Sequence, residues 1–165
     1  MKRYLPAILA LLIVTLAIPM LAQLRRGGLA EGQKAPEFTL SRLDGGSVSL
    51  GDVRGQVVLL NFWSAACPPC REKMPAMQQL YEDLRERGLV ILAVNVYDLP
   101  ALAREFIRQN GYTFPVLKDD GNVGRLYEVR YIPKTLLVDR EGFIRLIRIG
   151  PLEEQDLRVL VEKWL

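Results

Sequence analysis

Two cysteines separated by two prolines, Cys67-Pro68-Pro69-Cys70, are the residues of this chain best suited to chemistry. They follow an apolar run and precede a segment with helical periodicity, which places Cys67 at the N-terminus of a helix. There, unpaired backbone N–H groups and the positive end of the helix dipole lower the pKa of a thiol. Prolines are tolerated in a first helical turn. We therefore predict that Cys67 attacks a disulfide and that Cys70, one turn later, resolves the mixed disulfide.

The rest of the composition excludes most other kinds of site. The 165 residues include no histidine, which excludes Ser-His-Asp triads, histidine metal sites and histidine-ligated haem. The two cysteines supply only two of the ligands that a metal site usually needs, and Arg71 stands where covalent haem attachment needs histidine. A purely structural disulfide over so short a loop would constrain the unfolded chain little. We expect no metal and no dissociable cofactor, because the Cys67/Cys70 pair is itself the redox group.

The start of the chain has the composition of a membrane anchor. Residues 4–22 are uncharged and largely apolar, and basic residues flank them at 2–3 and 25–26. As a helix this run would extend over roughly 28 Å, close to the hydrocarbon thickness of a bilayer. A cleaved signal peptide is the alternative, but an Ala-x-Ala-like site is missing after the run. Charge barely decides the orientation, because both ends are basic.

The chain thus divides into three parts. Residues 1–26 form an anchor with basic flanks, 27–35 a tether, and 36–165 one domain. Outside the anchor, basic and acidic residues are nearly balanced, and no basic cluster with interleaved aromatic residues could bind nucleic acid.

The domain alternates between the periodicities of strands and helices. Apolar runs at 56–63 and 89–96 predict buried strands, and two short runs around a turn at 44–46 predict an N-terminal hairpin. The C-x-x-C segment opens a helix for which Gly88 is the expected C-cap. The remaining expected elements are strands at 37–40, 47–50, 114–117, 135–139 and 143–149 and helices at 100–109, near 122–127 and around 157–164. This order predicts an α/β fold, a mixed sheet with helices on both faces.

With these elements placed, the chain resembles the thioredoxin superfamily, and within it the membrane-anchored thiol-disulfide oxidoreductases of the TlpA/ResA/DsbE-like group. The resemblance covers nearly all of residues 32–165. It rests on Gly32–Phe38 at the start of the domain, Leu60-Asn61-Phe62-Trp63 before the C-P-P-C segment, Pro75 in the helix, the added strand and helix of 89–110, Phe114–Leu117, and Ile132–Asp139. It implies a thioredoxin-like domain at 36–165.

The resemblance also assigns roles to residues. It implies that Pro133 is cis and packs against the cysteine pair, and that the backbone of Ile132 pairs with a bound peptide in β fashion. With Pro68 and Pro69, these residues are the expected substrate-binding surface. The resemblance further implies a single-pass protein of the cytoplasmic membrane whose C-terminal domain lies outside the cytoplasm, in the periplasm.

Three positions near the cysteines differ from thioredoxin or from common members of the family, although the anchored group often has asparagine at the first of them. Asn61 replaces the buried aspartate of thioredoxin, and Ala66 replaces the tryptophan that commonly precedes the first cysteine. Lys73 stands where many members have glutamate, with Glu72 one position earlier. A lysine near the thiols favours the thiolate form. Asn61, Glu72 and Lys73 are therefore candidates for tuning the pKa of the thiols.

Together these features predict a membrane-anchored enzyme that reduces disulfides of exported proteins, with apocytochrome c during cytochrome c maturation as the substrate that the resemblance favours. A transmembrane thiol electron donor would re-reduce it. One alternative is a peroxiredoxin-like thiol peroxidase. Such enzymes usually carry a threonine and a proline at fixed places before the cysteine; here Ser64 stands three residues before Cys67, but Leu60 occupies the position of the proline. The other alternative is a non-enzymatic copper-binding or scaffold module, which the missing histidine weakens.

Overall fold

A computed structural model describes residues 28–165. The predicted anchor at 1–26 lies outside the described residues. Within the described part, no helix is both long and apolar enough to cross a membrane. Residues Gly32 to Ala35, which belong to the predicted tether, pack on the domain. The Gly32 N–H donates to the Ile144 carbonyl at 2.7 Å, and the Ile144 N–H donates to the Gln33 carbonyl at 2.8 Å.

The secondary structure follows the predicted order with small shifts at the ends. Its elements are β1 (Thr39–Ser41), β2 (Ser47–Ser49), η1 (Leu50–Val53), β3 (Val57–Trp63), α2 (Pro68–Leu84), η2 (Arg85–Arg87), β4 (Leu89–Asn95), α3 (Pro100–Asn110), β5 (Val116–Lys118), α4 (Val123–Leu126), β6 (Lys134–Val138), β7 (Ile144–Ile149) and α5 (Glu154–Glu162). Strands β1 and β2 form the predicted hairpin. Gly88 ends the helical segment with φ of 102°, a left-handed conformation that glycine adopts without strain.

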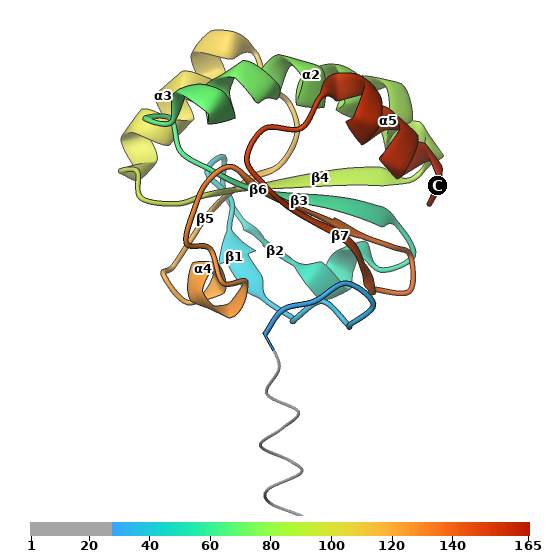
Figure 1. The fold of residues 1–165 in the computed structure, drawn as a ribbon. Helices are drawn as coiled ribbons and strands as arrows, with labels where there is room; N and C mark the ends of the chain where they lie inside the picture. Colours follow the sequence, from blue (N-terminus) through green and yellow to red (C-terminus); the bar gives the residue numbers. More distant parts are fainter. Residues whose placement is uncertain (1–27) are drawn as a thin grey trace, which may run out of the picture.

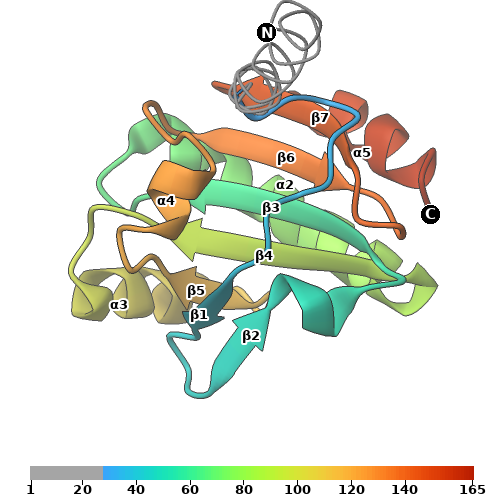
Figure 2. The ribbon, with the colours of Figure 1, turned by 90° about the horizontal axis from the view of Figure 1, so that it is seen from below.

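The main sheet has five strands in the order β5-β4-β3-β6-β7. It is mixed, because β3 pairs parallel with β4 and antiparallel with β6. All seven residues of β3 are buried, which fits a central strand covered on both faces. The C-terminal ends of β3 and β4 lie at the same edge of the sheet (Figure 2), and the segment that contains Cys67 starts from that edge.

Helices lie on both faces of the sheet, as predicted, but the long helices share one face. The three longer helices α2, α3 and α5 all lie on one face (Figure 1), where Leu59 and Trp63 of β3 pack with Met74 and Met77 of α2. The other face is covered by the β1–β2 hairpin, η1 and the short α4. On the second face, therefore, the only helices of the described residues are short ones. The physical reason is that the hairpin and the segment before it already cover most of the second face, where Phe38 packs edge-on against Tyr127.

One buried carboxylate holds the turn between β6 and β7. Asp139 is 3% exposed and accepts hydrogen bonds from the Phe143 N–H at 2.8 Å and from Nε of Arg145 at 2.6 Å. Burial alone would raise the pKa of Asp139, but these donors hold its pKa below the ordinary value.

We expect Asp139→Ala to lower the free energy of unfolding by about 2 kcal/mol at pH 7, because two partly buried donors, one of them charged, lose their buried acceptor. Urea unfolding at several pH values measures this. Because folding lowers the pKa of Asp139, its carboxylate stabilises the folded state at pH values above the unfolded pKa of about 3.9. The difference in stability between the wild type and Asp139→Ala should therefore disappear as the pH falls below about 4. Asp156→Ala, at an exposed position of α5, is the control and should change stability by less than about 1 kcal/mol. Equal losses in both variants would contradict this account.

Candidate active site

Cys67 lies at the junction between the central strand and the first long helix. It is the N-cap residue of α2, with Pro68 and Pro69 in the first turn. Its Sγ accepts a hydrogen bond from the Cys70 N–H at 3.3 Å. The two cysteines form a disulfide, with a Cα–Cα distance of 5.3 Å. Cys67 is partly exposed whereas Cys70 is only 2% exposed, so a partner reaches the sulfur of Cys67 first.

A carboxylate that the sequence analysis did not identify holds the loop before Cys67. One oxygen of Asp98 accepts from the Ser64 hydroxyl at 2.7 Å, and the other accepts from the Ala65 N–H at 2.5 Å and from Nδ2 of Asn95 at 2.6 Å. The Ser64 hydroxyl oxygen in turn accepts from the Ala66 N–H at 3.1 Å. The sequence did hold a signal for this contact: Asp98 follows β4, and the ends of adjacent parallel strands meet at one edge of the sheet.

The proline segment lies beside the cysteines, as predicted. The Ile132–Pro133 peptide bond is cis, and the Ile132 carbonyl oxygen lies 4.0 Å from Sγ of Cys67. Pro133 is buried, and its carbonyl accepts from the Gly150 N–H at 2.8 Å. The buried Lys134 secures the preceding loop, because its Nζ donates to the carbonyl of Tyr127 at 2.7 Å.

Two of the three candidate tuning residues meet in the interior. Lys73 is 7% exposed, and its Nζ donates to Oγ1 of Thr135 at 2.8 Å. Nδ2 of Asn61 donates to the same oxygen at 2.9 Å. Burial lowers the pKa of Lys73 to about 8, because the charged ammonium group is removed from water. Thr135 was not among the predicted site residues, although it stands two positions after Pro133.

The third candidate, Glu72, lies elsewhere. Its side chain is exposed and lines a surface hollow of about 270 Å³ together with Lys73, Pro69 and Glu153. Among residues 28–165 it forms no hydrogen bond or ion pair with either cysteine. The structure therefore groups Asn61 with Lys73 and leaves Glu72 on the surface.

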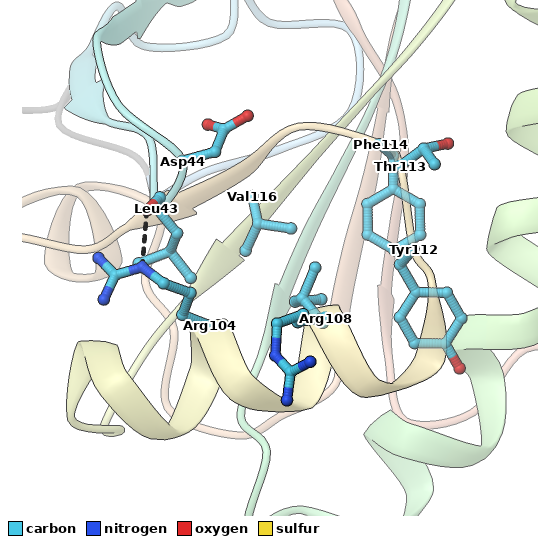
Figure 3. Close-up of a pocket in the computed structure, with 9 residues that line it drawn as sticks. Leu43, Asp44, Arg104, Arg108, Tyr112, Thr113, Phe114 and Val116 are labelled. Carbon is cyan, nitrogen blue, oxygen red and sulfur yellow. Dashed lines mark hydrogen bonds between the residues drawn. The ribbon is translucent and has the colours of Figure 1, made fainter.

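A separate cavity of about 280 Å³ lies between α3 and the turn of the hairpin (Figure 3), away from the cysteines. Its charged groups are already engaged: Asp44 pairs with Arg42, and Arg108 pairs with Glu105. Nε of Arg104 donates to the Leu43 carbonyl at 2.9 Å, the dashed contact in Figure 3. We assign this contact the structural role of fixing α3 against the hairpin.

Comparisons with known proteins agree with this geometry. The AhpC/TSA family model matches residues 31–147. The thiol-disulfide oxidoreductase ResA of Halalkalibacterium halodurans is 36% identical over 79% of this chain and 75% of its own length. The ResA of Geobacillus thermodenitrificans is 36% identical over 94% of this chain and 91% of its own length. A Chlorobium tepidum structure described as a DsbE thiol:disulfide interchange protein superposes with a TM-score of 0.78 at 34% identity, covering 82% of this chain and 98% of that one.

The fold is thus thioredoxin-like, and a cysteine pair at the start of α2 beside a cis-proline defines the site of a thiol-disulfide oxidoreductase. The chain belongs to the AhpC/TSA family and, within it, to the ResA/DsbE-like group of thiol-disulfide oxidoreductases.

The buried Lys73 should make stability depend on pH in the alkaline range. A pKa of about 8 in the folded state, against about 10.4 in the unfolded state, means that the unfolded state binds more protons between these values. Stability should therefore rise with pH in this window. Relative to Lys73→Met, we expect the free energy of unfolding of the wild type to increase by about 3 kcal/mol from pH 7 to pH 10.5.

Urea unfolding of both oxidised proteins tests this expectation, because oxidised cysteines do not titrate. Lys163→Met, at an exposed lysine near the C-terminus, is the matched control and should follow the wild type across the pH range. Parallel pH profiles for the wild type and Lys73→Met would show that the ammonium group is not buried in solution.

Proposed function

We propose that this protein is a membrane-anchored reductase of disulfides in exported proteins, with apocytochrome c as its substrate. Residues 4–22 hold it in the cytoplasmic membrane, and the thioredoxin-like domain lies on the extracytoplasmic side. The observation that carries the proposal is the disulfide of a partly exposed Cys67 and a buried Cys70 beside the cis Ile132–Pro133 bond. The two ResA relatives, matched over most of their length, support the reaction class.

The reaction proceeds through two exchanges. The Cys67 thiolate attacks one sulfur of the substrate disulfide, forms a mixed disulfide and releases the other substrate sulfur, which takes up a proton. Cys70 then loses its proton and attacks the sulfur of Cys67, which forms the Cys67–Cys70 bond and releases the second substrate thiolate. The substrate gains two electrons and the protein loses two, so no dissociable cofactor is needed. A transmembrane thiol donor reverses these steps and restores the dithiol.

The residues around the pair have distinct parts in this scheme. Pro68, Pro69 and Pro133 shape the surface that the substrate contacts, and the backbone of Ile132 pairs with the substrate chain. Lys73, one helical turn after Cys70, is a positioning residue whose positive charge favours the thiolate. Asn61 orients Thr135, the hydrogen-bond acceptor of Lys73.

In the reduced protein we expect Cys67 to react far faster than Cys70. The Cys70 N–H and the positive end of the α2 dipole stabilise its thiolate, and its sulfur is the exposed one. Alkylation with iodoacetamide across pH 4–9, read by mass spectrometry of the two cysteine peptides, should give an apparent pKa for Cys67 below about 8.5. A pKa at or above that value would overturn the assignment of Cys67 as the nucleophile.

A trapping experiment tests the substrate. Cys70→Ala should accumulate a stable mixed disulfide with an apocytochrome c peptide whose two haem-attachment cysteines are oxidised, because no thiol remains to resolve it. Cys67→Ala, the matched control, should form none. The wild-type dithiol should reduce the same peptide and consume hydrogen peroxide no faster than free dithiothreitol. Rapid peroxide consumption without a mixed disulfide would instead support the peroxidase alternative.

Location is tested separately from chemistry. The full chain should fractionate with membranes, and its domain should be digested by protease added to spheroplasts but not to intact cells. A chain without residues 1–26 should lose both properties. A protected domain in spheroplasts would contradict the proposed orientation.

A further inference from the structure

A hollow of about 310 Å³ opens next to the loop that leads into the nucleophilic cysteine. Its lining comes from the loop before Cys67, the loop after β4 and one side of α3: Ala65, Ala66, Asp98, Leu102, Glu105, Phe106 and Gln109. Ala66 is the residue that precedes Cys67, and its small side chain is exposed. The volume lies at the small end of the range for ligand sites, so it suits a single side chain rather than a complete small molecule.

The apolar part of this lining is held in a fixed place. Phe106 packs against Trp63, the last residue of β3, with ring centroids 5.6 Å apart. The Asp98 carboxylate fixes the loop through Ala65, as described above. Arg104 holds α3 through its bond to Leu43 (Figure 3). The hollow is therefore preformed, and occupying it does not require the chain to rearrange.

Large exposed apolar side chains gather around the same edge. Leu99 is 70% exposed and Leu102 60%, and both lie at the start of α3. Tyr97 and Tyr131 are 75% and 70% exposed, and the Tyr97 hydroxyl donates to the Val129 carbonyl in the loop before Pro133. Apolar surface concentrated in this way marks an interaction site. Tyr97 is next to Asp98, which holds the loop before Cys67, and Tyr131 is next to Ile132, whose carbonyl faces Sγ of Cys67, so the patch borders the segments that flank this sulfur.

The charged groups in the lining are already engaged. The oxygens of Asp98 accept three hydrogen bonds, and Glu105 pairs with Arg108 and also accepts from Gln109. Neither carboxylate needs a cationic partner, and both would repel an anionic one. The hollow therefore suits an uncharged apolar side chain and disfavours an acidic one.

We propose that this hollow, formed by Ala65, Ala66, Leu102 and Phe106, is a specificity subsite that receives a large apolar side chain next to the attacked cysteine of the substrate chain. This inference rests on the proposed reductase function and adds a preference among its substrates. Substrates with an aromatic or leucine side chain beside the cysteine bury that side chain against α3 while their sulfur meets Cys67. The subsite acts on binding and orientation and adds no step to the exchange.

The test compares three disulfide-bonded peptides that differ only in the residues flanking their cysteines, which are phenylalanine, serine or aspartate. The reduced full chain in detergent should reduce the phenylalanine peptide with a kcat/KM about tenfold above that of the serine peptide, and the aspartate peptide should be slowest. Ala66→Trp fills the hollow and should bring the phenylalanine-to-serine ratio close to one. Leu102→Gln removes apolar surface from the hollow and should lower the phenylalanine-to-serine ratio several-fold. Because Leu102 is exposed, this variant should fold normally even if a tryptophan at position 66 does not pack well.

Val159→Trp is the matched control, because it adds a tryptophan at an exposed position of α5 outside the active-site edge. It should leave the ratio unchanged. Equal rates for the phenylalanine and serine peptides in the wild type, or a ratio that Ala66→Trp and Leu102→Gln do not alter, would overturn the subsite. A wild type that self-associates in solution, with either variant abolishing the association, would also overturn it, since the hollow would then be an interface between copies of this chain. Failure of the wild type to reduce any peptide would instead contradict the reductase function.

Discussion

The chemistry of this protein depends on one constraint, that the start of α2 must point the Cys70 N–H and the positive end of the helix dipole at a single sulfur atom. β3 supplies the fixed end of this arrangement, because all seven of its residues are buried and it is paired on both sides. The carboxylate of Asp98 then holds the short loop between β3 and Cys67. The Cys70 N–H already faces Sγ of Cys67 in the oxidised state, at 3.3 Å. The donor that would stabilise a thiolate is therefore in place before any charge develops, which limits reorganisation during the exchange.

The interior next to this junction contains polar groups that reduce stability. Lys73 carries a buried ammonium group whose hydrogen bond goes to a neutral hydroxyl rather than to a carboxylate. Within the described residues, the indole N–H of Trp63 has no hydrogen-bond partner. Buried polar groups of this kind cost stability, and well-packed apolar residues would avoid the cost. Both residues lie close in the sequence to the cysteine pair. Functional sites are the places where natural sequences most often give up stability by burying polar groups.

The sequence was sufficient for the parts of the fold that have a local cause. The run at 56–63, the turn before β2 and the glycine at position 88 each predict their own element, and the structure confirms all three. Which face of the sheet a given helix covers is decided by contacts between distant segments, so local patterns could not assign the long helices to one face. Asp98 and Thr135 were missed for a similar reason, because each becomes a site residue only when neighbouring strands are aligned. Lys73 had a readable signal: with Cys70 and Met77 it lies on one apolar stripe of α2, three and four residues away from them.

The charge of Lys73 bears on which disulfides the protein can reduce. With a pKa of about 8, its side chain is mostly protonated at neutral pH. Lys73 lies one helical turn after Cys70, and a positive charge there would favour the thiolate of the reduced protein; a couple with a stabilised reduced form is more oxidising. Such a protein transfers electrons efficiently only to disulfides of still higher potential, which are strained or exposed ones. Under the proposed function, a disulfide between two haem-attachment cysteines, which closes a very small loop on an unfolded chain, would belong to this class, whereas the buried structural disulfides of folded proteins would not. The same lysine that lowers stability would thus restrict reduction to substrates that have not yet folded.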